Sequence, residues 1–278
     1  MPISSSTATP PPTVLAIAGF DPSAGAGLLA DLKTFAAHGV FGMACVTALT
    51  VQSTQGVRRV QGVDASIVTE TLACLKEDAF FDAIKVGMLG TAAVAGTVSD
   101  WLNREANVPV VLDPVLKSSS GTNLLEESGR ELLCSRLLPR VDWMTPNREE
   151  LGALTGNPMP ETRIQTENLA RRLLEMASDR GNPKLKVVVT GGEAESPDDL
   201  LLTGDICKWY AGERVPTSST HGTGCTFSAA LAARIALGDS AAAAVGHAKE
   251  YVAGALRHAF PVGRGTGPLN HFWNRRTG

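Results

Sequence analysis

Short apolar runs alternate with segments of helical periodicity along most of this chain, and this alternation constrains the fold more than any other feature. The apolar runs cover residues 14–19, 43–51, 84–89, 108–115, 143–145 and 185–190. Helical periodicity occupies residues 27–37, 65–77, 91–102 and 166–178, and a further segment that begins at Arg148. Strands that are apolar on both faces and alternate with helices form parallel sheets covered on both sides. The sequence therefore predicts an α/β fold, a three-layer α/β/α sandwich with a mostly parallel central sheet.

The pattern changes near residue 199. Residues 200–203 and 207–211 flank the turn Gly204-Asp205, which predicts a small antiparallel hairpin at one edge of the sheet. Two Ala-rich helices are expected after it, at residues 226–237 and 241–259.

The first twelve residues differ from the rest. They are mostly Ser, Thr, Ala and Pro and lack the charged start of a signal peptide, which predicts a disordered tail over residues 1–12. Neither an internal repeat nor a linker interrupts the remainder, so residues 13–278 are expected to form a single domain.

Composition limits the class of protein. Basic residues number 25 and acidic residues 28, a net charge of −3, whereas proteins that bind nucleic acid are usually basic. The longest apolar runs are shorter than the 18 residues that a membrane span requires. The five cysteines are scattered without a C-x-x-C pair, which favours a reducing compartment. We expect a cytoplasmic protein with neither a nucleic-acid nor a membrane partner.

A Gly-rich loop, GFDPSAGAG at residues 19–27, lies between the first predicted strand and the first helix. Residues 25–30 fit a loose dinucleotide pattern, but the first Gly of that motif should follow the strand at once. An NAD-dependent oxidoreductase is therefore a weak alternative. A loop that closes over a small ligand at the carboxyl ends of the strands fits the same residues.

A second Gly-rich segment, HGTGCT at residues 221–226, comes directly before a predicted helix. Two glycines allow successive backbone N–H groups to point at an anion, and the helix N-terminus adds partial positive charge. Cys225 should lie on the first helical turn, where its thiol pKa is expected to fall below the free value of about 8.5.

Polar residues end several of the predicted strands. Asp113 follows one strand, Glu150 lies just beyond another, Lys85 begins a third and Thr190 ends a fourth. Ligands of open α/β sheets bind at the carboxyl ends of the strands. Two carboxylates beside an anion site indicate Mg²⁺ and a nucleotide triphosphate.

Several motifs in the same order resemble the hydroxymethylpyrimidine/phosphomethylpyrimidine kinases of thiamine biosynthesis, which belong to the ribokinase-like superfamily. The resemblance covers nearly all of residues 14–273. It rests on AGFDPS (18–23), GAGLLADLKTF (25–35), TALTVQ (47–52), KVGML (85–89), LDPV (112–115), TPN with Glu150 (145–150), HGTGCT (221–226) and residues 263–268.

The resemblance implies an ATP-dependent, Mg²⁺-requiring enzyme that phosphorylates 4-amino-5-hydroxymethyl-2-methylpyrimidine and then its monophosphate, and that works as a homodimer. It also implies a role for each matching residue. Asp31 and Gln52 would hydrogen-bond the pyrimidine, and Gly19 and Met88 would line its pocket. The amides of Gly222, Thr223, Gly224 and Cys225 would form the anion hole, with Cys225 as the base. Asp113 and Glu150 would approach Mg²⁺ through water, and Thr190, Gly191 and Gly192 would border ATP.

Two positions depart from the family pattern. Thr190 stands where many members have a lysine, and Lys117 lies two positions earlier than the usual lysine of its segment. The nearest alternative is a pyridoxal kinase of the same family, although the Gln52 amide matches the donor–acceptor edge of an aminopyrimidine. A ligand-binding protein without catalysis would explain Gln52 and Asp31, but not an intact anion hole with two carboxylates that face a metal.

Overall fold

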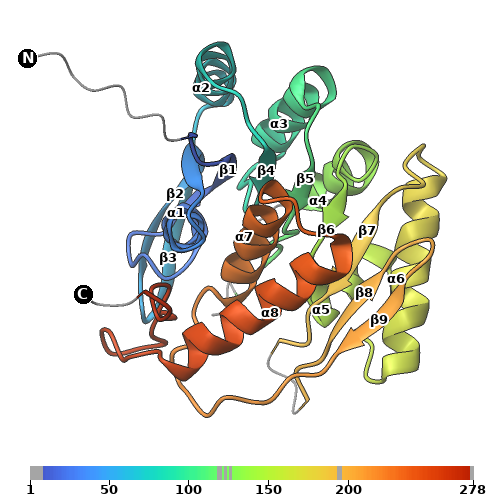
Figure 1. The fold of residues 1–278 in the computed structure, drawn as a ribbon. Coiled ribbons are helices and arrows are strands. Elements are labelled where there is room, and N and C mark those ends of the chain that lie inside the picture. Colours follow the sequence, from blue (N-terminus) through green and yellow to red (C-terminus); the bar gives the residue numbers. More distant parts are fainter. Residues whose placement is uncertain (1–8, 118–120, 122–123, 125–126, 193–195, 276–278) are drawn as a thin grey trace, which may run out of the picture.

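A single nine-stranded sheet runs through the described part of the chain (Figure 1). The structure is a computed structural model that describes residues 9–117, 121, 124, 127–192 and 196–275. The strand order is β3-β2-β1-β4-β5-β6-β7-β8-β9. The strands are β1 (Thr13–Phe20), β2 (Phe41–Ser53), β3 (Gly56–Gly62), β4 (Ala83–Val86), β5 (Val110–Leu112), β6 (Trp143–Met144), β7 (Lys186–Val189), β8 (Asp199–Leu202) and β9 (Cys207–Tyr210).

The centre of the sheet is parallel, as predicted. Strands β2, β1, β4, β5, β6 and β7 pair in parallel, while β3 pairs antiparallel with β2, β8 with β7, and β9 with β8. Alternate residues of β1 enter two different cores: Leu15 and Ile17 pack on one face of the sheet, Val14 and Ala16 on the other. Both faces of this strand therefore have to be covered by helices.

Helices cover the two faces unequally (Figure 1). Residues of α2, α3, α5 and α6 pack into one core, and residues of α1, α7 and α8 into the other. The three-layer sandwich predicted from the sequence is confirmed. The helices are α1 (Gly27–Ala37), α2 (Ala65–Asp78), α3 (Ala92–Glu105), α4 (Glu127–Leu132, continued by a π-helical turn Leu133–Leu137), α5 (Arg148–Thr155), α6 (Arg163–Ser178), α7 (Thr223–Ala236) and α8 (Ala241–Arg257).

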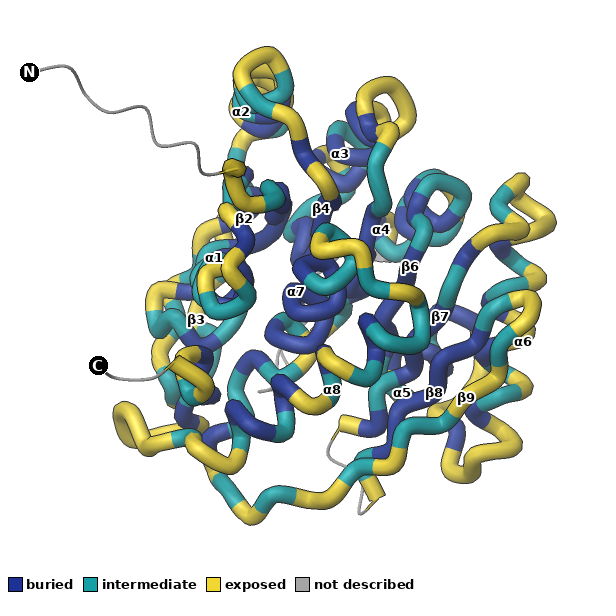
Figure 2. The backbone as a smooth tube through the Cα atoms, viewed as in Figure 1, coloured by how far each residue is buried: buried dark blue, intermediate teal, exposed yellow. Residues whose placement is uncertain are grey.

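Helix α7 lies in the interior, as its colour along most of its length shows (Figure 2). Its alanines allow a close approach to α8 and to the sheet, because a methyl side chain adds little bulk. It begins at Thr223, three residues earlier than the sequence predicted. The HGTGCT motif therefore supplies the first helical turn itself.

One edge hairpin was predicted and a second one was missed. Strands β8 and β9 form the predicted hairpin. At the opposite edge, β2 continues through the turn Thr54-Gln55 into β3. The sequence hides this turn because its two central residues, Thr54 and Gln55, are neither Asn nor Gly, and because Arg58 and Arg59 interrupt the apolar alternation of β3. The extra length of β2 carries Gln52 beyond the carboxyl end of β1.

Two further expectations concern the predicted N-terminal tail and a membrane partner. Residues 1–8 of the predicted tail lie outside the described residues, while the carbonyl of Pro12 already accepts a hydrogen bond from the Phe41 N–H at 2.8 Å. Among the described helices, none combines the length and the apolarity needed to cross a bilayer.

Candidate active site

The loop after β1 and the loop before α7 meet at the carboxyl ends of the parallel strands. Gly222 has φ +85°, and a Cβ there would lie 1.9 Å from the carbonyl oxygen of Gly25. Gly27 has φ +56°, and a Cβ there would lie 2.3 Å from the carbonyl oxygen of Gly19. Glycine alone fits both the positive φ and the close approach. The two Gly-rich motifs therefore form one continuous backbone surface.

The N-terminus of α7 opens onto this surface. The helix spans 14 residues and begins directly after Gly222, so Thr223, Gly224 and Cys225 form its first turn. The backbone N–H groups of a first turn lack partners within the helix and carry partial positive charge. Gly224 is exposed, and a Cβ on it would meet no atom within 4 Å. This geometry suits an anion such as a phosphate.

Cys225 departs from its predicted chemistry. Burial raises the pKa of its thiol to about 12, and the nearby carboxylates of Asp113 and Asp31 add to the rise. Lys85 and a hydrogen bond from the Gly27 N–H lower this pKa without offsetting the other causes. The expected thiolate is therefore wrong for this structure. The helix N-terminus was visible in the sequence, whereas the two carboxylates come from distant parts of the chain.

Beneath Cys225 lies a buried ion pair. The Lys85 ammonium lies 2.9 and 3.0 Å from the two carboxylate oxygens of Asp31, and both side chains are completely buried. Burial disfavours the ammonium, but Asp31, Cys225 and Asp113 together raise the pKa of Lys85. Asp31 was expected to bind the pyrimidine. Here both of its oxygens face Lys85 below the surface, so the structure gives no support to direct contact with a ligand.

Asp113 follows β5 and lies close to the same ion pair. Its Oδ2 accepts a hydrogen bond from the Ser228 hydroxyl at 3.0 Å and lies 4.0 Å from the Lys85 ammonium. The nearby Cys225 thiol helps to lower the pKa of this carboxyl. Burial raises the pKa of Asp113 in spite of these partners. Asp113 thus connects the ion pair to the first two turns of α7.

Glu150 belongs to the N-terminus of α5. Its Oε2 accepts the Asn147 N–H at 2.9 Å, while the Asn147 side chain accepts the Glu150 N–H at 2.8 Å, a reciprocal cap. Burial and the charge of Asp113 raise the pKa of Glu150 to about 8. Two buried carboxylates that repel each other suit a divalent cation, because oxygen ligands and negative charge are what Mg²⁺ prefers. In the described residues no three His, Cys, Asp or Glu side chains are grouped for a metal, so these two would need water to complete its coordination.

Gly19 and Met88, which were expected to line the pyrimidine pocket, lie next to each other. A Cβ at Gly19 would lie 2.8 Å from the Met88 sulfur, so the missing side chain leaves room for the thioether. The Met88 carbonyl accepts a hydrogen bond from the Thr47 hydroxyl at 2.6 Å, and its side chain packs with Ala48 and Leu124. The structure therefore brings together the two residues expected to line an apolar pocket.

Gln52 lies among polar groups that the sequence did not single out. Its amide nitrogen lies 3.1 Å from His221 Nε2, and the same imidazole nitrogen lies 2.8 Å from Asp21 Oδ2. Asp21 also accepts hydrogen bonds from the backbone N–H groups of Ser23 and Ala26. Burial alone would raise the pKa of Asp21, but the hydrogen bonds from His221 and Ser23 lower it. Both His221 and Asp21 stand inside recognised motifs, but their contact joins positions 200 residues apart.

Thr190, Gly191 and Gly192 follow β7 at the far end of the site. The Thr190 N–H donates to the Pro146 carbonyl at 3.0 Å, and the Gly191 N–H donates to Asp199 Oδ1 at 2.8 Å. Lys249 of α8 lies 2.8 Å from the other oxygen of Asp199. Sequence reasoning missed Asp199 and Lys249, which fix this segment. A carboxylate at the start of an edge strand gives no signal that it binds a loop eight residues earlier.

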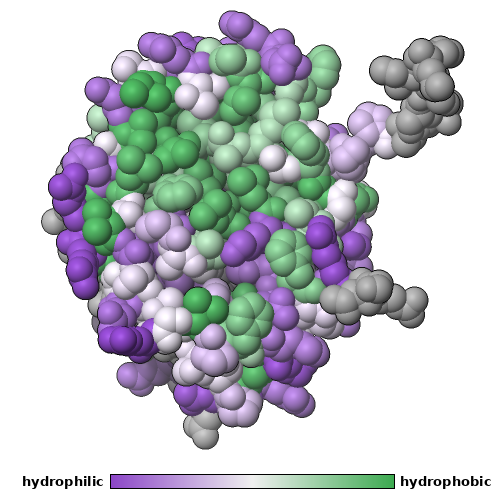
Figure 3. All heavy atoms as spheres, turned by 90° about the vertical axis from the view of Figure 1, so that its left-hand side faces the viewer, coloured by the Kyte–Doolittle hydropathy of each residue, from purple (hydrophilic) through white to green (hydrophobic). Residues whose placement is uncertain are grey.

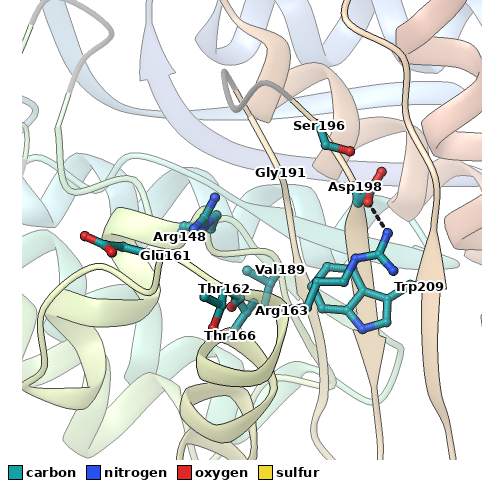
Figure 4. Close-up of a pocket in the computed structure, with 10 residues that line it drawn as sticks. All are labelled: Arg148, Glu161, Thr162, Arg163, Thr166, Val189, Gly191, Ser196, Asp198 and Trp209. Atoms are coloured by element: carbon teal, nitrogen blue, oxygen red, sulfur yellow. Dashed lines mark hydrogen bonds and ion pairs between the residues drawn. The ribbon is translucent and has the colours of Figure 1, made fainter.

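Lys117 and a nearby pocket do not join the site. Lys117 forms an ion pair with Glu149 at 2.5 Å on the surface. A pocket of about 320 Å³ lies between α6 and the sheet edge, and the Arg163 guanidinium there pairs with Asp198 and stacks over Trp209 (Figure 4). It shares only Gly191 with the predicted site residues. Its lining is Arg148, Glu161, Thr162, Arg163, Thr166, Val189, Gly191, Ser196, Asp198 and Trp209.

Comparisons with known proteins agree with the motifs. The family model described as phosphomethylpyrimidine kinase matches residues 21–270. A hydroxymethylpyrimidine/phosphomethylpyrimidine kinase of Salmonella typhimurium is 40% identical, with 93% of this chain and 96% of that protein covered. Its counterpart in Staphylococcus aureus strain MSSA476 is 36% identical, with 94% of each chain covered.

Solved structures show the same fold. The phosphomethylpyrimidine kinase of Clostridium difficile superposes with a TM-score of 0.75 at 32% identity, over 87% of this chain and 97% of that one. The pyridoxal kinase of Bacillus subtilis, solved as an ADP complex, superposes with a TM-score of 0.84 at 30% identity, over 94% and 97%. The predicted ribokinase-like fold and kinase class are confirmed, and the chain belongs to the phosphomethylpyrimidine kinase family.

Proposed function

We propose that this chain transfers phosphate from ATP to the hydroxymethyl group of 4-amino-5-hydroxymethyl-2-methylpyrimidine, and then phosphorylates the monophosphate to the diphosphate. The observation that carries the proposal is the contact between the acceptor loop at Gly25 and the anion loop at Gly222. An acceptor held by the first loop lies beside the partial positive charge of the second, where a transferred phosphoryl group would be stabilised.

The raised thiol pKa changes how the first step would be assisted. An alcohol must lose its proton as it attacks, and a thiol with a pKa of about 12 is neutral at pH 7. Cys225 and Asp113 are close enough for each to shift the pKa of the other. Sulfur can therefore take the proton of the alcohol while the original thiol proton moves to the Asp113 carboxylate. Asp113 becomes neutral, its negative charge passes to the attacking oxygen, and sulfur stays neutral throughout.

The second step makes a different demand. A phosphate monoester has a second pKa of about 6, so it is already a dianion near pH 7 and needs no base. Cys225→Ala should therefore slow the first phosphorylation by roughly 10²-fold or more and the second far less. Cys225→Ser keeps a hydroxyl that can relay a proton, and should retain more of the first step than the alanine variant. Equal loss in both half-reactions would remove the relay.

Asp113 and Glu150 would hold Mg²⁺. The bound ion would neutralise the two carboxylates and the phosphate oxygens of ATP. The cap that fixes Glu150 and the Ser228 contact that fixes Asp113 orient both carboxylates before the ion arrives.

The remaining assignments follow the positions of the residues. Gln52, Gly19 and Met88 would contact the pyrimidine, and Asp31 would act through Lys85 rather than by direct contact. Thr190, Gly191 and Gly192 would border ATP, with Asp199 and Lys249 holding their backbone in place.

A homodimer would cover an apolar face. Phe41, Leu49 and Val51 of β2 are each about half exposed, and Figure 3 shows apolar side chains gathered on the side of the molecule where β2 lies. We assign a second copy to this face, because the resemblance implies a dimer. Light scattering of the wild type should give twice 29.1 kDa, and Val51→Lys should reduce it to the monomer mass.

A cytoplasmic location and a single domain over residues 13–278 stay predictions, the latter supported by the continuous sheet.

Phosphorus NMR of the products tests the proposal. With ATP, Mg²⁺ and the pyrimidine alcohol, a monophosphate signal should appear first and a pyrophosphate pair should follow. The second candidate function is phosphorylation of pyridoxal, favoured by the superposition on pyridoxal kinases. A product from pyridoxal and none from the pyrimidine would support that candidate instead.

A further inference from the structure

A chain of polar contacts runs from the acceptor loop to the end of β2. Asp21 Oδ2 lies 2.8 Å from His221 Nε2, which lies 3.1 Å from the amide of Gln52. The other end of that amide lies 3.1 Å from the Thr50 hydroxyl, which donates to the Phe20 carbonyl at 3.0 Å. Each group in the chain has a limited number of protons, so the directions of these hydrogen bonds can be derived.

The shared imidazole nitrogen fixes the first direction. One nitrogen cannot donate to Asp21 and accept from Gln52 at the same time. The carboxylate of Asp21 has no proton to give, so Nε2–H of His221 donates to it at the shorter of the two distances. Gln52 must then turn its carbonyl oxygen to His221, where it shares the same proton. The structure places the Gln52 amide nitrogen toward His221 and its oxygen toward Thr50. The proton count reverses these two positions, because the oxygen and nitrogen of an amide are assigned from their hydrogen-bond partners.

The same orientation satisfies the other end of the chain. The Gln52 NH₂ group then donates to the Thr50 oxygen, whose own proton goes to the Phe20 carbonyl. The opposite orientation would bring two donors together at His221 and leave Thr50 one proton for two acceptors. One hydrogen-bond pattern therefore satisfies all five groups.

The imidazole is held where it stands. A Cβ at Gly25 would lie 2.4 Å from its Cδ2 atom, so the loop packs directly on the ring. The backbone N–H of His221 donates to the Gly267 carbonyl at 3.0 Å. The side chain is 12% exposed. Rotation of the ring away from Gln52 would lose the Asp21 contact and collide with this packing.

We propose that His221 is a positioning residue that fixes the orientation of the Gln52 amide and thereby makes the acceptor site specific for an amino-substituted nitrogen heterocycle. The proposal rests on the proposed role of Gln52 in acceptor binding. An amide offers one acceptor and one donor side by side. In the fixed orientation the oxygen would accept from an exocyclic amino group, and the nitrogen would donate to an unprotonated ring nitrogen, of a heterocycle that lies along the amide. A 4-oxopyrimidine reverses that order, because its exocyclic oxygen accepts and its ring N–H donates.

The two pyrimidines therefore form a matched pair of probes. Each would carry the 2-methyl and 5-hydroxymethyl groups, with an amino or an oxo group at carbon 4. A site built for one hydrogen-bond pattern rejects the other strongly, because its polar groups are left unpaired. We expect the wild type to prefer the amino compound by roughly 10²-fold or more in kcat/KM.

The test is the ratio of kcat/KM for the two probes in three variants. His221→Leu releases the amide, so the preference should fall by roughly tenfold to a hundredfold, mainly through a higher KM for the amino compound. His221→Gln places an amide N–H where Nε2–H stands and should restore much of the preference. His258→Leu, at a histidine that stacks on Trp273, should leave the preference unchanged. Any general damage to the anion loop affects both probes equally and cancels in the ratio.

Three results would overturn the proposed role of His221. An unchanged ratio in a His221→Leu enzyme that still phosphorylates the amino compound would overturn the inference and leave the proposed function intact. Equal loss with both probes would assign His221 to loop structure alone. Wild-type enzyme that phosphorylates pyridoxal and neither pyrimidine would overturn the proposed function, and this inference with it.

Discussion

Two buried carboxylates beside the anion loop, Asp31 and Glu150, are compensated in opposite ways. Asp31 lies beneath Cys225 with an ammonium, that of Lys85, on both of its oxygens. Glu150 accepts a backbone hydrogen bond from Asn147 and has the negative charge of Asp113 as its neighbour. Burial raises the pKa of Asp31 to about 6 and that of Glu150 to about 8.

The charges of Asp31 and Lys85 therefore contribute to the stability of the fold, whereas those of Glu150 and Asp113 are available to bind a cation. A buried ion pair completes its own compensation, so Asp31 and Lys85 are balanced before any ligand binds. Glu150 and Asp113 are compensated only when a cation arrives from solution. We therefore expect variants at the first pair to change stability most, and variants at the second to change the response to Mg²⁺.

The largest effect is expected when the internal cation is removed. Lys85→Met leaves Asp31 buried without its partner and should lower the free energy of unfolding by about 3–5 kcal/mol. The double variant Lys85→Met/Asp31→Leu removes both charges and should recover most of that loss. Urea denaturation followed by circular dichroism measures both. A single variant as stable as wild type would show that the pair is not structurally important.

Removing the charge of Glu150 should have the opposite effect on stability. Glu150→Gln replaces a buried carboxyl that resists ionisation with a neutral isostere and should raise the free energy of unfolding without metal at pH 8. Added Mg²⁺ should raise the melting temperature of the wild type and leave that of the variant almost unchanged. Equal Mg²⁺ shifts in the two proteins would argue against a metal role for Glu150.

The pH dependence of stability follows from the same carboxyl. Its pKa is about 8 in the folded chain and 4.5 ordinarily. Between these values the unfolded chain has lost the proton that the folded chain still holds, so raising the pH through this window favours unfolding. The contribution of Glu150 to stability should therefore decline from pH 4.5 to pH 8 and stay level above it. Subtracting the Glu150→Gln profile from that of the wild type isolates the effect, and a difference that rises with pH would contradict it.

A smaller effect is expected at the end of the site that is proposed to border ATP. Asp199→Asn weakens the ion pair with Lys249 while keeping an oxygen for the Gly191 N–H, so about 1–3 kcal/mol of stability should be lost. The KM for ATP should rise more than the KM for the pyrimidine, which lies at the other end. Steady-state rates with each substrate varied in turn provide the measurement. A larger rise in the pyrimidine KM would mean that the two ends are not independent.

The smallest effect is expected at Lys117. Its side chain is 50% exposed and that of its partner Glu149 is 60% exposed. Exposed ion pairs contribute about 0–1 kcal/mol, so Lys117→Ala should change stability by less than about 1 kcal/mol and the rate by less than about twofold. A tenfold fall in rate would instead give this lysine a part in phosphate binding.

The sequence predicted the sheet, the two Gly-rich loops and the family, because these depend on local periodicity and on motifs of a few residues. It did not predict β3, whose arginines mask its alternation. It also assigned Asp31 to the ligand and a thiolate to Cys225. Contacts far apart in sequence bear on both residues: Lys85 faces both oxygens of Asp31, whose ligand role stays a prediction, and burial in the folded chain raises the thiol pKa of Cys225. Local patterns show which residue types are present, but not which charges burial brings together.

We expect this site to phosphorylate an aminopyrimidine alcohol in preference to pyridoxal. The most direct test is the initial rate of ADP formation with ATP, Mg²⁺ and each alcohol as the sole acceptor, at several acceptor concentrations. We predict a kcat/KM at least about tenfold higher for 4-amino-5-hydroxymethyl-2-methylpyrimidine than for pyridoxal, because only the pyrimidine offers both hydrogen bonds to the Gln52 amide. An equal or higher kcat/KM for pyridoxal would contradict the claim.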